Sequence, residues 1–131
     1  MPEHPNVALI RKGYEAFAKA DMAALSELFA EDVVWHMPGH NPVSGVHRGR
    51  EAVFAAFAKF FELSGGTLKL DDHTILADDD HAVALNRATA SRKWKQLDLL
   101  GADVFHVKNG KVVEFWAFSE DQRLDDEFWS S

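Results

Sequence analysis

Residues 105–116 read FHVKNGKVVEFW, and this stretch decides the fold of the C-terminal half of the chain. Two runs rich in valine and aromatic residues flank Asn109-Gly110, the dipeptide that a two-residue type I′ hairpin turn prefers. A loop of two residues fixes the register of the strands that it joins. The predicted pairs are Lys108 with Lys111, Val107 with Val112, Phe105 with Glu114, Asp103 with Trp116, and Gly101 with Phe118.

Alternation along these two strands sorts their side chains onto two faces. One face carries Asp103, Phe105, Val107, Val112, Glu114, Trp116 and Phe118, and the other carries Val104, His106, Val113, Phe115 and Ala117. Both faces are apolar near the middle, whereas a sheet with one face in water alternates apolar with polar residues. We therefore expect one face to pack on helices and the other on a second subunit, which predicts a homodimer.

The segments before the hairpin predict further strands and, before those, helices. Strand patterns cover residues 68–76 and 82–95, with a turn at 78–80, and the hairpin strands follow at 97–108 and 111–118. Helical spacing of apolar residues begins after Pro5, again after the N-cap candidate Asp21, and again over about 50–63. The first helix has the apolar positions Val7, Ile10, Tyr14 and Phe17, and the second has Met22, Leu25, Leu28 and Phe29.

Between the second and third helices, residues 33–37 predict a short strand that ends at Pro38, and the glycine-rich stretch 39–49 predicts a loop. The acidic tail, with Leu124 and Phe128 four residues apart, predicts a last helical turn or two. Helices followed by a run of strands indicate the α+β class rather than a doubly wound sheet.

Composition bounds the possible functions. The chain has 131 residues, which predicts one domain over residues 1–131. Its 14 basic and 21 acidic residues give a net charge of −7, which disfavours nucleic acid and anionic membranes as partners. It has no cysteine, which excludes disulfides and thiolate chemistry. With no apolar run near the roughly 18 residues of a membrane span and no signal-peptide pattern, we expect a cytoplasmic protein.

No cofactor is expected. The chain has no glycine-rich phosphate loop that opens a helix and no histidine pair with a glutamate on a helix. His36, His40 and His47 gather around the predicted loop, but no carboxylate stands at ligand spacing beside them. We expect these histidines to form ordinary hydrogen bonds, with His47 at the rim of a pocket, and we expect no metal.

The sequence also resembles a known family. Residues 29–35 (FAEDVVW), Gly45 and residues 48–53 (RGREAV) resemble the N-terminal half of SnoaL-like proteins, and residues 105–116 resemble their C-terminal half. This family lies in the superfamily of nuclear transport factor two, ketosteroid isomerase and SnoaL-type polyketide cyclases. The resemblance covers nearly the whole chain and implies a cone-shaped, curved antiparallel sheet packed against three N-terminal helices, with a cavity between them.

The resemblance also bears on single residues. Ketosteroid isomerases place a carboxylate base just before a proline that follows the first strand, and this position falls on Met37. Their oxyanion-donating tyrosine aligns with Gly13, about 100° of helix from Tyr14. Their protonated aspartate in the penultimate strand matches Asp103. With two of the three positions absent, the resemblance implies that the protein is not a standard ketosteroid isomerase.

Asp103 and Arg87 are the candidate catalytic residues. Aromatic neighbours would desolvate Asp103 and raise its pKa, as suits an acid or base in a cavity. Arg87 stands among small residues of the preceding strand and could face the same side, in which case the two form a structural ion pair. Both interpretations remain open.

A second set of residues is expected to bind a small apolar molecule. It comprises Trp35, Met37, His47, Phe105, Trp116 and Phe118. Aromatic residues at strand alternation also fit an ordinary core, and the resemblance favours cavity lining for Trp35, Met37 and Trp116. A solvated rim is expected to hold Glu114, Glu120, Asp121, Asp125, Asp126 and Glu127.

Two function classes follow from these candidates. The first is a cofactor-free isomerase, cyclase or hydratase that uses Asp103 as its acid or base. The second is a non-catalytic module that binds a ligand or protein, in which Arg87 satisfies Asp103. The fold alone does not separate them, because one fold hosts many functions.

Overall fold

The computed structural model describes residues 3–130, and Met1, Pro2 and Ser131 lie outside this range. The elements in chain order are α1 (Pro5–Ala18), α2 (Met22–Leu28), β1 (Phe29–Met37), β2 (Gly45–Arg48), α3 (Arg50–Ser64), β3 (Lys69–Ala77), β4 (His81–Arg92), β5 (Lys95–Lys108), β6 (Lys111–Ser119) and α4 (Gln122–Trp129). No helix in residues 3–130 is long and apolar enough to cross a membrane.

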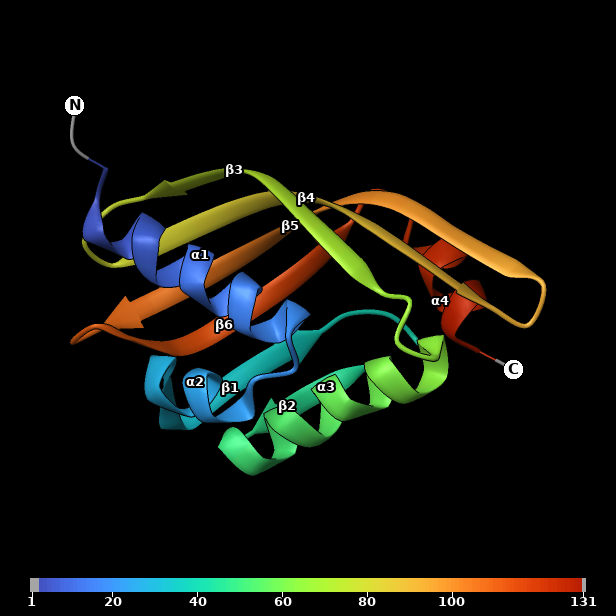
Figure 1. The fold of residues 1–131 in the computed structure, drawn as a ribbon, viewed down its shortest axis with the longest axis horizontal. Helices are drawn as coiled ribbons and strands as arrows, with labels where there is room; N and C mark the ends of the chain where they lie inside the picture. Colours follow the sequence, from blue (N-terminus) through green and yellow to red (C-terminus); the bar gives the residue numbers. More distant parts are fainter. Residues whose placement is uncertain (1–2, 131) are drawn as a thin grey trace.

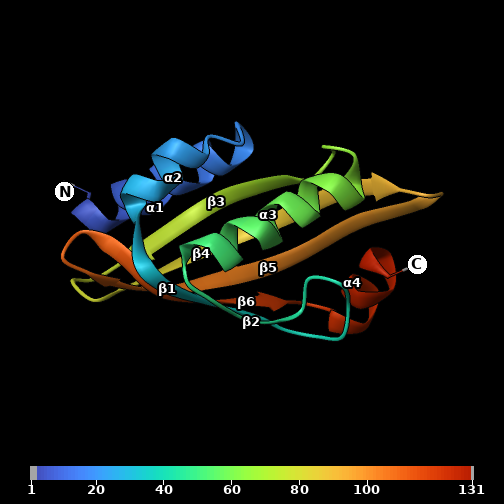
Figure 2. The ribbon, with the colours of Figure 1, turned by 90° about the horizontal axis from the view of Figure 1, so that it is seen from below.

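The strands form one six-stranded sheet in the order β2-β1-β6-β5-β4-β3 (Figure 1). Strands β3 to β6 make an antiparallel meander, β1 joins β6 in parallel, and β2 pairs antiparallel with β1. Helices α1, α2 and α3 lie on one face of the curved sheet, and α4 lies at one end (Figure 2). The predicted α+β class, with a curved sheet against three N-terminal helices, is confirmed.

The ends of the helices follow from local chemistry. Pro5 occupies the first turn of α1, where a missing N–H costs nothing, and the His4 ring accepts a hydrogen bond from the Asn6 backbone. Asp21 caps α2 by accepting a hydrogen bond from the backbone N–H of Ala24 at 3.1 Å. Gly65 ends α3 in the left-handed conformation.

Two boundaries differ from the sequence prediction. The stretch 39–49 is not entirely a loop, because residues 45–48 form β2 against β1, a pairing that has no local sequence signal. Phe29 belongs to β1 rather than to α2, and its side chain packs in the core near Phe54 and Phe57. The acidic tail forms an eight-residue helix, α4, of about two turns as predicted, and its Phe128 and Trp129 are buried.

The hairpin of β5 and β6 contains a β-bulge that changes its faces. Asn109 and Gly110 have the positive φ angles of the predicted turn, 54° and 74°, and Val107 pairs with Val112 as predicted. The next pair is His106 with Glu114, so that Val113 is an extra residue on β6. Beyond the bulge the predicted pairs are wrong. The observed partners are Phe105 with Phe115, Val104 with Trp116, Asp103 with Ala117, and Ala102 with Phe118.

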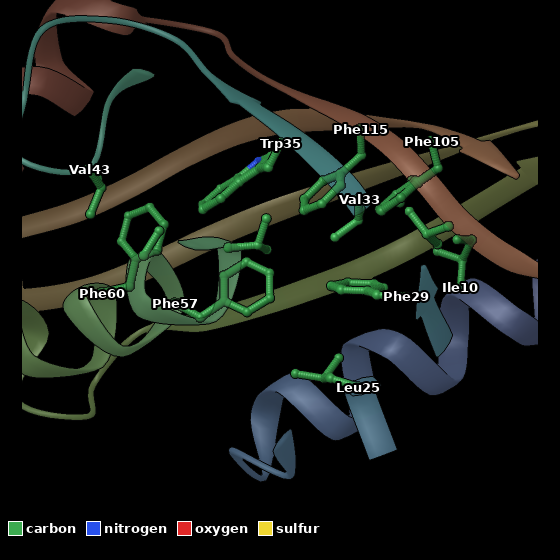
Figure 3. Close-up of a cluster of buried hydrophobic side chains, with 14 of the residues drawn as sticks. Ile10, Leu25, Phe29, Val33, Trp35, Val43, Phe57, Phe60, Phe105 and Phe115 are labelled. Carbon is green, nitrogen blue, oxygen red and sulfur yellow. The ribbon is translucent and has the colours of Figure 1, made fainter. Parts of the chain in front are cut away.

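This shift of one residue exchanges the two faces of β6 beyond Val113. Phe115 turns toward the helices and Trp116 turns away from them, the reverse of the prediction. On the helix side, rings from four adjacent strands stand in one row: His47, Trp35, Phe115 and Phe105, with successive centroids 5.4, 5.4 and 5.5 Å apart. Figure 3 shows Trp35, Phe115 and Phe105 of this row above Phe57 and Phe29.

The outer face of the sheet, turned away from α1, α2 and α3, is rich in exposed apolar side chains. Its exposed members are Val46, Leu76, Leu85, Leu100 and Phe118. Phe118 is 55% and Leu100 is 52% exposed, and they lie on neighbouring strands beside Ala102. Exposed apolar side chains on neighbouring strands, such as Phe118 and Leu100, are typical of an interaction site.

We expect this outer face to be buried between two copies of the chain, related by a two-fold axis. Light scattering should give twice the mass of the chain, and Leu100→Asp should reduce it to one chain because it places a charge in the apolar contact. The matched control is Trp94→Ser, which removes a fully exposed aromatic residue at the β4–β5 turn. A wild-type protein of single-chain mass at micromolar concentration would contradict the prediction.

Candidate functional site

A cavity of about 150 Å³ lies between the inner face of the sheet and the helices. A space of this size, when lined by apolar side chains, holds a ligand such as a single aromatic ring. Most of its lining is apolar, including Leu9, Ile10, Phe17, Leu28, Phe29, Trp35, Met37, Phe57, Leu70, Leu99, Phe105 and Phe115. The polar side chains of its lining are Tyr14, Asn86, Asp103, Ser119 and Asp125, together with the Trp35 and Trp129 indoles.

Asp103 is held by two neutral donors. The Tyr14 hydroxyl donates to Asp103 Oδ2 from α1, and Asn86 Nδ2 donates to the same oxygen from β4 at 3.1 Å. Gly101 makes room for this arrangement, because a Cβ at that position would lie 3.2 Å from Asn86 Oδ1 and 2.7 Å from the Phe118 carbonyl oxygen. Both donors use Oδ2, which leaves Oδ1 for a molecule in the cavity.

Burial dominates the electrostatics of this cluster. It raises the pKa of Asp103 to about 6, although the hydrogen bonds from Tyr14 and Asn86 act in the opposite direction. The negative charge of Asp72 adds to the increase. Burial and the neighbouring carboxylate also raise the pKa of Tyr14 well above its usual range, so that Tyr14 stays protonated. Asp103 can therefore gain or lose a proton near neutral pH, which is what an acid or base requires.

Arg87 does not pair with Asp103. Strand alternation places Asn86 on the inner face of β4 and Arg87 on the outer face, where its guanidinium binds both carboxylate oxygens of Asp98 at 2.5 and 2.6 Å. Of the two interpretations that the sequence left open, the ion pair of Arg87 with Asp103 is therefore wrong, and the hydrogen-bond partners of Asp103 are uncharged.

Two members of the cluster were missed or discounted from the sequence. Tyr14 reaches Asp103, although the family alignment placed the tyrosine position at Gly13. A signal was present, because Tyr14 shares the predicted inward face of α1 with Val7 and Ile10. Asn86 also had a signal: it is the one polar residue among Ala82, Ala84, Ala88 and Ala90 at the alternate positions of β4.

The candidate ligand-binding residues divide into two groups. Trp35, Met37 and Phe105 line the cavity, and Phe118 borders it with a side chain that is largely exposed. Trp116 lies on the outer face of the sheet, stacked on His36 at 5.0 Å, because of the bulge. His47 lies behind Trp35 on β2, and its Nε2 hydrogen-bonds the Val43 carbonyl oxygen at 2.8 Å.

The other polar candidates take separate places. His36 Nε2 lies 2.5 Å from Glu114 Oε2, on the outer face. Asp125, predicted for a solvated rim, is instead buried in the wall of the cavity. Its Oδ1 accepts a hydrogen bond from Trp129 Nε1 at 3.1 Å, one turn further along α4, and burial raises its pKa.

Because the pKa of Asp103 is raised, the stability of the fold should fall as the pH rises from about 4 to about 6. The folded state holds this proton up to about pH 6 and the unfolded state only up to about pH 4, so this group destabilises the fold as pH rises between the two values. Asp103→Asn removes the effect. Urea unfolding should show the variant gaining on the order of 3 kcal/mol relative to wild type between pH 4 and pH 7. If the difference in unfolding free energy between variant and wild type is the same at pH 4 and pH 7, burial of the Asp103 carboxylate is contradicted.

Removing the Tyr14 hydroxyl should move the pKa of Asp103 upward, beyond about 6, because that hydrogen bond favours the charged form. The measurement is a pH titration of the side-chain carboxyl by ¹³C NMR in Tyr14→Phe. Arg87→Gln is the matched control and should leave the pKa of Asp103 in place, since Arg87 binds Asp98. If Arg87→Gln raised the pKa of Asp103 more than Tyr14→Phe did, the result would support an ion pair between Arg87 and Asp103.

The comparisons with known proteins agree with this fold. The model of the SnoaL-like domain matches residues 10–115. An uncharacterised protein of Mycobacterium tuberculosis (strain H37Rv) is 30% identical over 131 residues, which is 99% of this chain and 100% of that protein. Bal32a, from a soil-derived mobile gene cassette, is 40% identical with a TM-score of 0.92 and covers 95% of this chain and 96% of its own. A Xanthomonas campestris protein of unknown function with a cystatin-like fold is 30% identical with a TM-score of 0.87, over 95% and 98% of the two chains. The family match and these relatives agree, and the chain belongs to the SnoaL-like family.

Proposed function

We propose that the protein binds a small, mostly apolar carbonyl compound in the cavity and catalyses a cofactor-free isomerisation or cyclisation with Asp103 as the acid and base. The observation that carries this proposal is a titratable carboxyl in an apolar cavity with only neutral hydrogen-bond donors on it. Membership of the SnoaL-like family, a polyketide-cyclase type of family, supports this class of reaction.

Proton transfer at carbon fits the chemistry of this site. Asp103 Oδ1 takes a proton from a carbon next to the ligand carbonyl, the C–H bond breaks, and an enolate forms. In an isomerisation Asp103 returns the proton to a different carbon. In a cyclisation the enolate carbon bonds to a second carbonyl carbon, and the proton goes to the new alkoxide. Both sequences balance without an oxidant or a reductant.

Tyr14 and Asn86 act as positioning residues in this mechanism. Their hydrogen bonds hold the carboxyl by Oδ2, so that Oδ1 keeps a fixed direction toward the ligand. The apolar wall excludes water, which keeps the pKa of Asp103 near the value that general acid–base catalysis needs at neutral pH.

Deuterium exchange tests this proposal without knowledge of the natural substrate. The probe is cyclohexanone, a single-ring ketone with exchangeable α-hydrogens, incubated with the protein in D2O and followed by ¹H NMR. Wild type should accelerate the exchange, and Asp103→Asn should lower the protein-dependent rate by about a hundredfold, the scale of one acid–base group. Arg87→Gln is the matched control and should retain the wild-type rate.

Two results would overturn the proposal. Exchange in Asp103→Asn at the wild-type rate would remove Asp103 from the chemistry. Binding of cyclohexanone without any accelerated exchange would favour a non-catalytic ligand-binding module, the other function class that the sequence indicates.

A further inference from the structure

Two further polar side chains line the cavity at the end where α4 lies (Figure 2). Ser119 is the last residue of β6, and Asp125 belongs to α4. Neither takes part in the proposed proton transfer at Asp103. Ligand pockets are mostly apolar and use a small number of polar groups to orient the ligand. A second polar end of this cavity is therefore a candidate contact for a second polar group of the ligand.

The sheet places Ser119 on the same face as Asp103 and close to it. Alternation puts Phe115, Ala117 and Ser119 on the inner face of β6, and all three line the cavity. Asp103 pairs with Ala117, so Ser119 is its diagonal neighbour, about 7–8 Å away. The residue directly opposite Ser119 is Gly101, which has no side chain to fill the space between the strands' inner faces. A single ring can therefore meet Asp103 with one substituent and Ser119 with another.

The Ser119 hydroxyl is able to act as both acceptor and donor. Its Oγ accepts a hydrogen bond from the Asp121 backbone N–H at 3.3 Å. A hydroxyl has one hydrogen of its own and a second lone pair, so Ser119 can still donate to a ligand oxygen or accept from a ligand donor.

Asp125 supplies acceptor capacity with neutral partners. Its side chain is buried, and its Oδ1 accepts a hydrogen bond from Trp129 Nε1 at 3.1 Å. Gln122 Nε2 lies 3.4 Å from Asp125 Oδ2 but only 2.9 Å from Asp126 Oδ1. Because a carboxylate has about four acceptor positions, Asp125 can accept a further hydrogen bond. A ligand hydroxyl that donates to Asp125 and accepts from Ser119 would use both side chains.

The charges of the lining exclude an anion as this second group. Of the lining residues, all drawn from 3–130, none is a lysine, arginine or histidine, whereas Asp103 and Asp125 are acidic. A carboxylate or phosphate on the ligand would thus be buried without a cation, which is costly. An ammonium group also costs more than a hydroxyl to bury among apolar side chains. A neutral hydroxyl fits this end of the cavity best.

We propose that Ser119 and Asp125 bind a hydroxyl group of the ligand, across the ring from the carbonyl that reacts at Asp103. The substrate class is then a compact cyclic hydroxy ketone rather than a plain ketone or a keto acid. This inference rests on the proposed function, because it takes the reacting carbonyl to lie at Asp103.

Three single-ring ketones that differ in one substituent test the inference. They are cyclohexanones that carry a hydroxyl, a methyl or a carboxylate group at carbon 4. Calorimetry at neutral pH should show wild type binding 4-hydroxycyclohexanone about fivefold more tightly than 4-methylcyclohexanone, the scale of one net hydrogen bond. The carboxylate should bind most weakly of the three, because it brings a negative charge to Asp125 without a cation.

Two variants locate the contact. Ser119→Ala should remove the preference for the hydroxyl compound, because the ligand then loses water without gaining the serine partner. Asp125→Asn keeps an oxygen for Trp129 and should weaken the preference, because a neutral acceptor bonds less strongly than a charged one. The matched controls are Ser91→Ala on β4 and Glu127→Gln on the exposed side of α4. Neither residue lines the cavity, and both variants should keep the wild-type ratio of affinities.

The outcomes separate this inference from the proposed function. If wild type binds the hydroxyl and methyl compounds equally, prefers the methyl compound or binds the carboxylate most tightly, the second contact is overturned and the role of Asp103 stands. Full preference for the hydroxyl compound in Ser119→Ala also overturns the contact. If Asp103→Asn exchanges cyclohexanone at the wild-type rate while Ser119→Ala loses the preference, the contact stands and the proposed reaction is overturned. If wild type binds none of the three ketones, both are contradicted.

Discussion

The single extra residue at Val113 determines which side chains of β6 enter the interior. Beyond this bulge, Phe115 joins the row of rings formed with Trp35 and Phe105, and Trp116 faces outward. In the regular register Glu114 would stand on the inner face opposite Phe105, where burial of its carboxylate would be costly. The bulge moves Glu114 to the outer face, beside His36. One unpaired residue in the ladder thus keeps a charge out of the core and shapes one wall of the cavity.

The neutrality of the partners of Asp103 gives the cavity its chemical character. A guanidinium beside this carboxylate would lower its pKa and hold it charged. Tyr14 and Asn86 stabilise the charged form less, and burial therefore prevails and raises the pKa to about 6. Strand alternation alone gives Asp103 a neutral partner on β4 rather than a cation, because Asn86 and Arg87 are neighbours in sequence and face opposite sides of the sheet. Exchanging the two residues would place a guanidinium beside Asp103 and turn the neutral cluster into a structural ion pair.

Local patterns predicted most of the elements, and pairings between distant segments account for what they missed. Pro5, Asp21 and Asn109-Gly110 each act within a few residues, and the helices and the hairpin turn lie where these residues predicted them. Strand β2 and the bulge depend on partners elsewhere in the chain, and Val112-Val113 offers no sign of which valine is extra. Asp103 was identified because a carboxylate is unusual in an apolar strand. Asn86 was missed because its charged neighbour Arg87 was considered as the partner of Asp103. Strand alternation lets only one of these two residues face inward, and that residue is Asn86.

The size of the cavity follows from small residues at defined places rather than from loose packing. Ala88 lines the cavity beside Asn86 on the inner face of β4, and Gly101 lines it from β5. On the opposite wall, a Cβ at Gly13 would meet no atom within 4 Å, so the helix itself leaves that space open. Glycine inside a helix costs about 1 kcal/mol relative to alanine, and larger side chains on β4 would gain apolar contacts. A core selected for stability alone would fill this space. Its small residues leave room beside Asp103, whose hydrogen-bond partners are neutral, and this is the arrangement of a binding cavity.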